Sequence, residues 1–161
     1  MIVVADTSPL CYLVLIGEIN LLLSLFQEVT IPQAVFCELQ AEGAPDEVRA
    51  WINEQPNWIK ISTITPIEDP SLNSLHQGER EAIILAEEIK ANLIILDEKA
   101  ARTIAKERGL KVVGLLGILG QAAQQKIIDF PTAINRLQST NFRIAPSLLT
   151  SLLDKYQNSS E

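Results

Sequence analysis

Short β-rich apolar segments alternate along this chain with longer segments of helical periodicity, and this alternation constrains the fold more than any other feature of the sequence. A parallel strand that is covered by helices on both faces is apolar throughout, as in "IVVA" at 2–5. Further strands are predicted at 28–31, 58–63, 92–97 and 111–114. Helices are predicted at 8–19, 20–26, 32–43, 45–55, 79–91, 98–109, 115–126, 130–139 and 145–157. Strands that alternate with helices predict an α/β fold, a single-domain α/β/α sandwich around a mostly parallel central sheet.

The length of the chain bounds its domain organisation. With 161 residues, 47% of them hydrophobic, the chain is long enough for one well-buried hydrophobic core but too short for two domains of ordinary size. We therefore expect one domain over 1–157 and a polar C-terminal tail at 158–161. The apolar stretch 9–26 contains polar residues and is typical of two buried helices, not of a membrane span. No basic segment precedes the apolar start, so we expect no signal peptide and a soluble, cytoplasmic protein without a membrane association.

Several classes of site are disfavoured by what the sequence lacks. Cys11 and Cys37 are the only two cysteines and lack paired spacing, so we expect buried free thiols. His76 is the single histidine and cannot alone supply a His-based zinc site or a Ser/His/Asp triad. The formal net charge of −7 argues against a protein that coats polyanions, although it leaves room for a local basic strip.

Two acids follow predicted strands directly. Asp6 ends the first strand and Asp97 ends the fourth, and ligands of such folds bind at the carboxyl ends of the strands. Either acid could instead cap the next helix, and Glu98 competes with Asp97 for that position. Thr7 and Ser8 already offer a cap after the first strand, so the pattern favours a site at Asp6.

Two further acids lie on predicted helices. Glu38 is one turn from Val35, at the border of the packed side of its helix, where a solvated glutamate is as ordinary as a functional one. Glu79 opens a helix, where an acid also favours the helix dipole. All four acids can reach one edge of the sheet, and clustered carboxylates need a hard cation such as Mg²⁺ or Mn²⁺. Such a site suits phosphodiester hydrolysis.

These segments resemble the PIN-domain nucleases, in particular the VapC-like toxins and related small prokaryotic PIN-like proteins. The resemblance covers nearly the whole chain through "VVADTSPL", "VFCELQA", "GEREAIILA", "LIILDEKAAR" and "VVGLLGIL". It matches the four acids of the family to Asp6, Glu38, Glu79 and Asp97 as catalytic and metal-binding residues, with Ser8 at a nearby hydroxyl position that orients metal or substrate. It implies an endoribonuclease that depends on Mg²⁺ or Mn²⁺, acts as the toxin of a type II toxin-antitoxin system, is neutralised by a small antitoxin protein and is frequently a homodimer.

The match departs from the family pattern at two of the acids. The third acid is a glutamate where many members have aspartate, and Glu81 competes with Glu79 for its role. At the fourth motif many members have a threonine two residues before the acid, whereas here Leu96 precedes Asp97. Either Asp97 or Glu98 could therefore face the metal.

A basic strip lies beside the fourth acid. Lys99, Arg102 and Lys106 recur at helical spacing and share one face of the helix that follows Asp97. The strip is either a solvated surface or a set of phosphate contacts that steer RNA to the acids.

Two other classes of function compete with the nuclease. A receiver-like phosphoacceptor domain needs a pair of acids after the first strand, and this chain has only Asp6 there. A catalytically degenerate PIN-like module would bind nucleic acid or a protein partner without metal. The pattern as a whole favours a PIN-like, metal-dependent ribonuclease and leaves open its RNA target, cleavage sequence, antitoxin, oligomeric state and preferred ion.

Overall fold

The computed structural model describes residues 1–157, and the tail expected at 158–161 lies outside this range. A five-stranded sheet forms the centre of the fold, in the order β3-β2-β1-β4-β5. Its strands are β1 (Val3–Ala5), β2 (Val29–Pro32), β3 (Ile59–Ser62), β4 (Leu93–Ile95) and β5 (Val112–Val113). Every neighbouring pair is parallel. The predicted α/β fold with a parallel sheet is confirmed.

Strand β1 lies at the centre and separates two apolar clusters. Successive side chains of a strand point to opposite faces, so Val3 and Ala5 join one cluster and Val4 the other. The register aligns Val4 with Thr30 of β2 and with Ile94 of β4. Covered on both faces, the strand is fully buried. This burial explains why its sequence is apolar without alternation.

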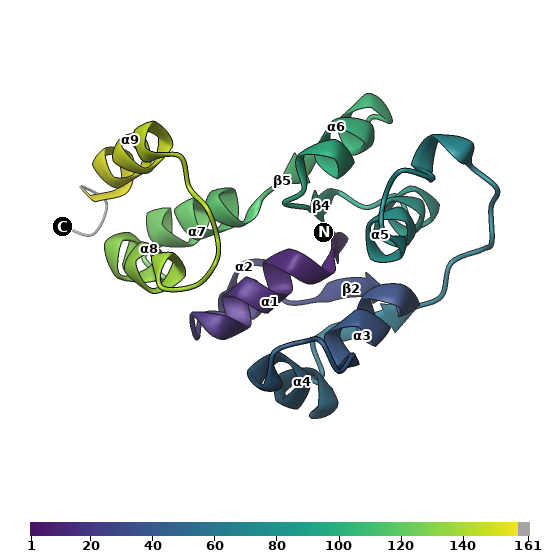
Figure 1. Ribbon diagram of the computed structural model, residues 1–161, viewed down its shortest axis with the longest axis horizontal. Helices are drawn as coiled ribbons and strands as arrows, with labels where there is room; N and C mark the ends of the chain where they lie inside the picture. The colour runs from purple at the N-terminus through teal and green to yellow at the C-terminus, as the bar shows by residue number, and fades with distance from the viewer. Residues whose placement is uncertain (158–161) are drawn as a thin grey trace.

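The larger cluster covers one face of the sheet and takes side chains from most of the helices. These helices are α1 (Thr7–Leu15), α2 (Leu21–Phe26), α3 (Gln33–Gln40), α4 (Asp46–Asn53), α7 (Leu115–Gln124), α8 (Phe130–Gln138) and α9 (Pro146–Gln157). Figure 1 shows α7, α8 and α9 grouped at the end of the molecule away from α5. None of the helices in the described part of the chain is both long and apolar enough to span a membrane.

The smaller cluster covers the other face through α5 (Gln77–Glu88) and α6 (Lys99–Glu107). Residues 63–76 lead into α5 and contain one short helix, η1 (Pro70–Leu72). Leu72 of this segment is fully buried in the smaller cluster. This segment is therefore packed in part against the sheet, through Leu72.

Two predictions about α1 and the cysteines are wrong. Helix α1 begins at Thr7, not Ser8, and ends at Leu15 because Gly17 adopts a positive φ of 77° and turns the chain. Cys11 and Cys37 are free thiols as expected, but Cys11 is only half-buried and Cys37 is exposed. Cys37 lies on the solvent side of α3, whereas its neighbours Val35 and Leu39 pack into the core.

Candidate functional site

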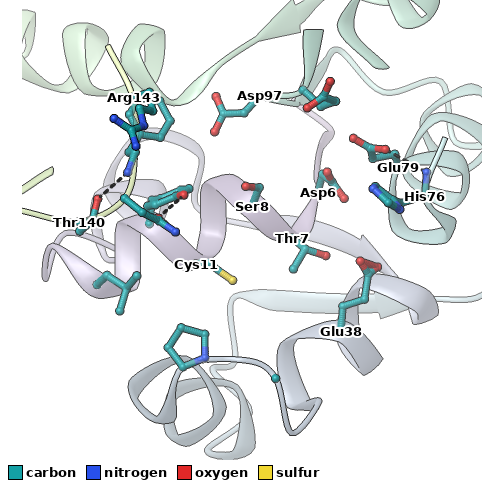
Figure 2. A pocket seen from close by; sticks show the side chains of 17 residues that line it. Asp6, Thr7, Ser8, Cys11, Glu38, His76, Glu79, Asp97, Thr140 and Arg143 are labelled. Atoms are coloured by element: carbon teal, nitrogen blue, oxygen red, sulfur yellow. Dashed lines mark hydrogen bonds between the residues drawn. The ribbon is translucent and has the colours of Figure 1, made fainter. Parts of the chain in front are cut away.

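A cavity of about 940 Å³ opens at the carboxyl ends of β1, β2 and β4 and collects the acids that the sequence singled out. All four predicted acids line it, each from a different segment: Asp6 after β1, Glu38 on α3, Glu79 on α5 and Asp97 after β4. Figure 2 shows their side chains arranged around this space, with Ser8 beside them on α1. The topology thus brings together side chains that are up to 91 residues apart in the sequence.

Asp6 is the most deeply buried of these acids, with only 4% of its surface exposed. It occupies the position before α1, yet its side chain makes no capping hydrogen bond within the described chain. Its Oδ1 atom also has no hydrogen-bond partner among residues 1–157. Burial raises the pKa of Asp6 to about 7, and the charges of Glu79, Glu38 and Asp97 act in the same direction. The backbone N–H of Thr7 lowers this pKa, but by less than burial raises it. Asp6 therefore does not serve as a helix cap.

Glu38 reaches the cavity from the far side of α3 and is half-buried there. Burial raises the pKa of its carboxyl, and the charges of Glu79 and Glu81 act in the same direction, while the Thr7 hydroxyl and the charge of His76 lower it. Its carboxylate lies against the backbone of Gly78: a Cβ at residue 78 would overlap Oε2 and lie 2.8 Å from Cδ. Glu38 can keep this position only if residue 78 has no Cβ.

Glu79 and Glu81 have different surroundings, which separates the two candidates for the third acid. Glu79 is 6% exposed and lines the cavity, and its Oε1 accepts a hydrogen bond of 3.0 Å from the backbone N–H of His76. Glu81 accepts from the backbone N–H of Ala34 at 3.1 Å and lines two smaller cavities instead. The geometry therefore favours Glu79.

Asp97 and Glu98 both line the cavity, but only Asp97 is held in place. Its Oδ1 accepts a 2.8 Å hydrogen bond from the N–H of Leu115, whereas its Oδ2 is buried without a partner among the described residues. Burial raises the pKa of Asp97, while the Leu115 hydrogen bond and the charge of Arg102 lower it. Glu98 is exposed at the start of α6. Asp97 is thus the better-positioned acid.

A family model described as PIN domain matches residues 2–158 of the sequence. The chain belongs to the PIN domain family. A search of curated proteins found no match. PIN domains are generally nucleases and generally use divalent metal ions.

The acids of this PIN domain fit a hard divalent cation by the chemistry of their donor atoms. Buried oxygens of Asp6, Glu38 and Asp97 have no hydrogen-bond partner among residues 1–157, and a cation would satisfy them. No three His, Cys, Asp or Glu side chains in that range are grouped as a complete metal site. Mg²⁺ usually keeps several water ligands and needs only one or two carboxylates from the protein. The donor set therefore fits an ion that retains part of its water shell.

Of the three residues in the predicted basic strip of the PIN domain, one lines a cavity. Lys99 and Lys106 are exposed and line none of the cavities described here, while Arg102 is half-buried and lines a second cavity beside Asp97. The three share a helix face, and their contact with RNA stays a prediction.

One wall of the cavity is a segment that no sequence pattern predicted, Thr140 to Arg143 between α8 and α9. Tyr12 of α1 donates a 2.6 Å hydrogen bond to Oδ1 of Asn141 and meets the ring of Phe142 edge-on at 5.0 Å. No local pattern in "STNFRIAP" gives the position of this segment, because the position depends on packing against α1, more than 120 residues earlier.

Proposed function

We propose that this PIN domain is an endoribonuclease that depends on Mg²⁺ or Mn²⁺, and the observation that carries the proposal is the convergence of four carboxylates on one cavity. Burial and mutual repulsion raise the pKa of Asp6 in that cavity to about 7. An uncompensated cluster of this kind costs folding free energy unless a cation neutralises it. Binding of a divalent cation is the simplest explanation for this cluster of carboxylates.

In this proposal Asp6 and Asp97 hold the ion, Glu38 and Glu79 complete its surroundings, and Glu98 lies at the rim. The bound ion supplies Lewis-acid stabilisation of the negative charge that develops on the phosphate oxygens. The exposed hydroxyl of Ser8 at the start of α1 orients the substrate. Hydrogen bonds from His76 to Glu79 and from Leu115 to Asp97 fix two of the carboxylates before substrate arrives.

The test is cleavage of a mixed RNA pool by purified protein with Mn²⁺, Mg²⁺ or EDTA. We expect cleavage with either metal, none with EDTA, and a loss of at least about a hundredfold in Asp6→Asn, because this substitution removes a buried metal ligand. Glu81→Gln is the matched control, because Glu81 lies outside the cavity. Cleavage that persists in Asp6→Asn would belong to a contaminant and would contradict the proposal.

We further infer that the protein is the toxin of a type II toxin-antitoxin system in the cytoplasm, with a small antitoxin as partner and a homodimer as its assembly. The resemblance of its motifs to the VapC-like toxins supports this inference. A small gene beside the one that encodes this chain, whose product suppresses the RNA cleavage, is the expected result. No suppressing neighbour would contradict the toxin assignment while leaving the nuclease proposal intact.

A catalytically degenerate PIN-like module that binds nucleic acid or protein is the second candidate. It is favoured by one observation, that residues 1–157 contain no ready-made group of three metal ligands. RNA binding without Mn²⁺ binding and without cleavage would establish this candidate in place of the nuclease.

A further inference from the structure

The acid cavity continues into a second cavity on the far side of Asp97. This second cavity has a volume of about 470 Å³ and shares Asp97, Phe142 and Arg143 with the first. Its other walls are Arg102 of α6, Gly114 after β5 and apolar side chains of α7 and α9. Since β5 is the neighbour of β4 at the sheet edge, the two adjoining cavities, together called the groove below, lie along the ends of β2, β1, β4 and β5.

The acids and the arginines are unevenly distributed along this groove. Asp6, Glu38 and Glu79 line only the half over β1 and β2, and Arg102 lines only the half over β5. Asp97 and Arg143 line both halves. Neither guanidinium makes a hydrogen bond or an ion pair with any residue in 1–157. Arg108 and Arg136, by contrast, each pair with a carboxylate. Arg102 is thus close enough to Asp97 to lower its pKa, but neither arginine is hydrogen-bonded or ion-paired within residues 1–157.

The two arginines reach the groove from different elements. Arg102 lies beside Asp97 across the open backbone of Gly114, where a Cβ would be 3.1 Å from both Arg102 Nη1 and Asp97 Oδ1. Arg143 follows Asn141 and Phe142, which Tyr12 holds against α1. Figure 2 shows Arg143 on the side of the cavity away from Glu38 and Glu79.

The remaining wall of the second cavity is apolar. Leu148 and Leu152 of α9 line it together with Phe142, and Leu148 is 46% exposed. Two guanidiniums that face an apolar wall match the chemistry of one nucleotide, whose phosphate accepts hydrogen bonds from arginine and whose base packs on apolar side chains.

We propose that Arg102 and Arg143 form a phosphate subsite that binds the nucleotide next to the cleaved bond, between Asp97 and the apolar wall of α9. This inference rests on the proposed function in requiring a single-stranded nucleic acid as substrate. It makes both arginines positioning residues, which hold the strand across the carboxylates and carry out no chemistry. The subsite also sets the path of the bound nucleic acid, which runs across the carboxyl ends of the β-strands from β5 toward β2.

The test is the affinity of a short fluorescent 2′-O-methyl oligoribonucleotide in EDTA, measured at several salt concentrations for Arg102→Gln, Arg143→Gln and the double variant. We expect each single substitution to weaken binding about tenfold, since each removes a charged hydrogen bond to phosphate. Each should also lower the slope of log K against log salt by about 0.7, the value for one phosphate contact of a single strand.

Lys60→Gln is the matched control, because it removes one exposed positive charge from β3 at the opposite edge of the sheet. Arginine variants that bind with the affinity and salt slope of Lys60→Gln would overturn the subsite. So would a wild-type protein that does not bind the oligonucleotide. The RNA cleavage assay separates this failure from that of the proposed function. If the protein cleaves RNA but the arginine variants bind the oligonucleotide as wild type does, the subsite is overturned and the nuclease proposal stands. If binding depends on the arginines but no RNA is cleaved, the nuclease proposal alone is overturned.

Discussion

Asp6 illustrates how one carboxyl can be costly to the fold and useful to the site. Its side chain is buried at the end of β1, where the cavity offers too few hydrogen bonds to replace its water shell. Because its pKa in the folded chain is about 7, above the ordinary value of 3.8, the folded chain binds this proton more tightly than the unfolded chain does. The protonated carboxyl is therefore tolerated at low pH, and stability is lost as the pH rises from 3.8 to about 7.

We therefore predict that Asp6→Asn stabilises the metal-free protein above pH 7 by at most about 4 kcal/mol, and by little near pH 4. Asparagine cannot ionise, so the loss of stability between these pH values disappears. Urea unfolding at both pH values in EDTA measures the effect, and the exposed Asp154→Asn is the control. A gain that is the same at both pH values would show that Asp6 does not titrate in this range.

Gly78 acts on the site through Glu38. In Gly78→Ala the new methyl group would overlap the Glu38 carboxylate, which sits at the end of a flexible side chain and can move aside. We predict a change in stability within about 1 kcal/mol, because alanine also favours the helix. Affinity for Mn²⁺ should fall about tenfold if a misplaced ligand costs about 1.4 kcal/mol.

A double-mutant cycle separates this effect from a general one. In a Glu38→Ala background, Gly78→Ala should have no further effect on Mn²⁺ affinity, because the two residues act through one carboxylate. Additive losses would show that Gly78 acts by another route.

The acids were predictable one by one because strand ends and helix starts are visible in the sequence. Asp6 and Asp97 follow apolar strands, and the structure brings both to one cavity with Glu38 and Glu79. The choice between Glu79 and Glu81 was not predictable, because it depends on which glutamate meets the N–H of His76 or of Ala34. Arg143 was missed because its position depends on a contact with α1.

The strands and helices follow their sequence patterns closely, and the differences lie at their ends. Each predicted strand is found within its expected range or one residue beyond it, as in β2, which extends to Pro32. Helix ends depend on backbone geometry that hydrophobic periodicity does not encode: α6 stops at Glu107 as the chain turns through Gly109, with a φ of 82°. The packing of residues 63–76 could not be predicted from the sequence either, because it depends on a side chain from another element.

That side chain is Arg108, at the end of α6. It donates two hydrogen bonds to Glu87 at 3.0 and 2.6 Å, one to Ser71 at 3.1 Å, and pairs with Asp69 at 2.8 Å. The Ser71 hydroxyl and the Arg108 guanidinium hold the pKa of Asp69 below its ordinary value. One arginine thus joins α5, α6 and the short helix η1.

We predict that Arg108→Gln destabilises the protein by about 1 kcal/mol, as expected for a partly exposed ion-pair network. Hydrogen exchange should become faster at the backbone N–H groups of Ser71 and Leu72, and remain unchanged in β1. Lys111→Gln, which removes an exposed charge from the same region, is the control. Unchanged exchange at Ser71 would mean that the packing of Leu72 alone holds the segment.

The order of the strands could not be predicted from the sequence, although their parallel direction could. The order β3-β2-β1-β4-β5 places Asp6 at the centre of the sheet, next to β4, the strand that leads to Asp97. The same order places the arginines on the β5 side, so the groove becomes less acidic toward that edge. The net charge of −7 conceals this local asymmetry, because formal charge counts residues without placing them.

Binding of Mn²⁺ to the purified protein, measured by titration calorimetry near pH 8, tests the central claim most directly. The claim is that Asp6, Glu38, Glu79 and Asp97 form one divalent-cation site. It predicts saturable binding to wild type and to Glu81→Gln, and a loss of at least about tenfold in affinity in both Asp6→Asn and Asp97→Asn. Absence of binding by folded wild type, or equal binding by all four proteins, would contradict it.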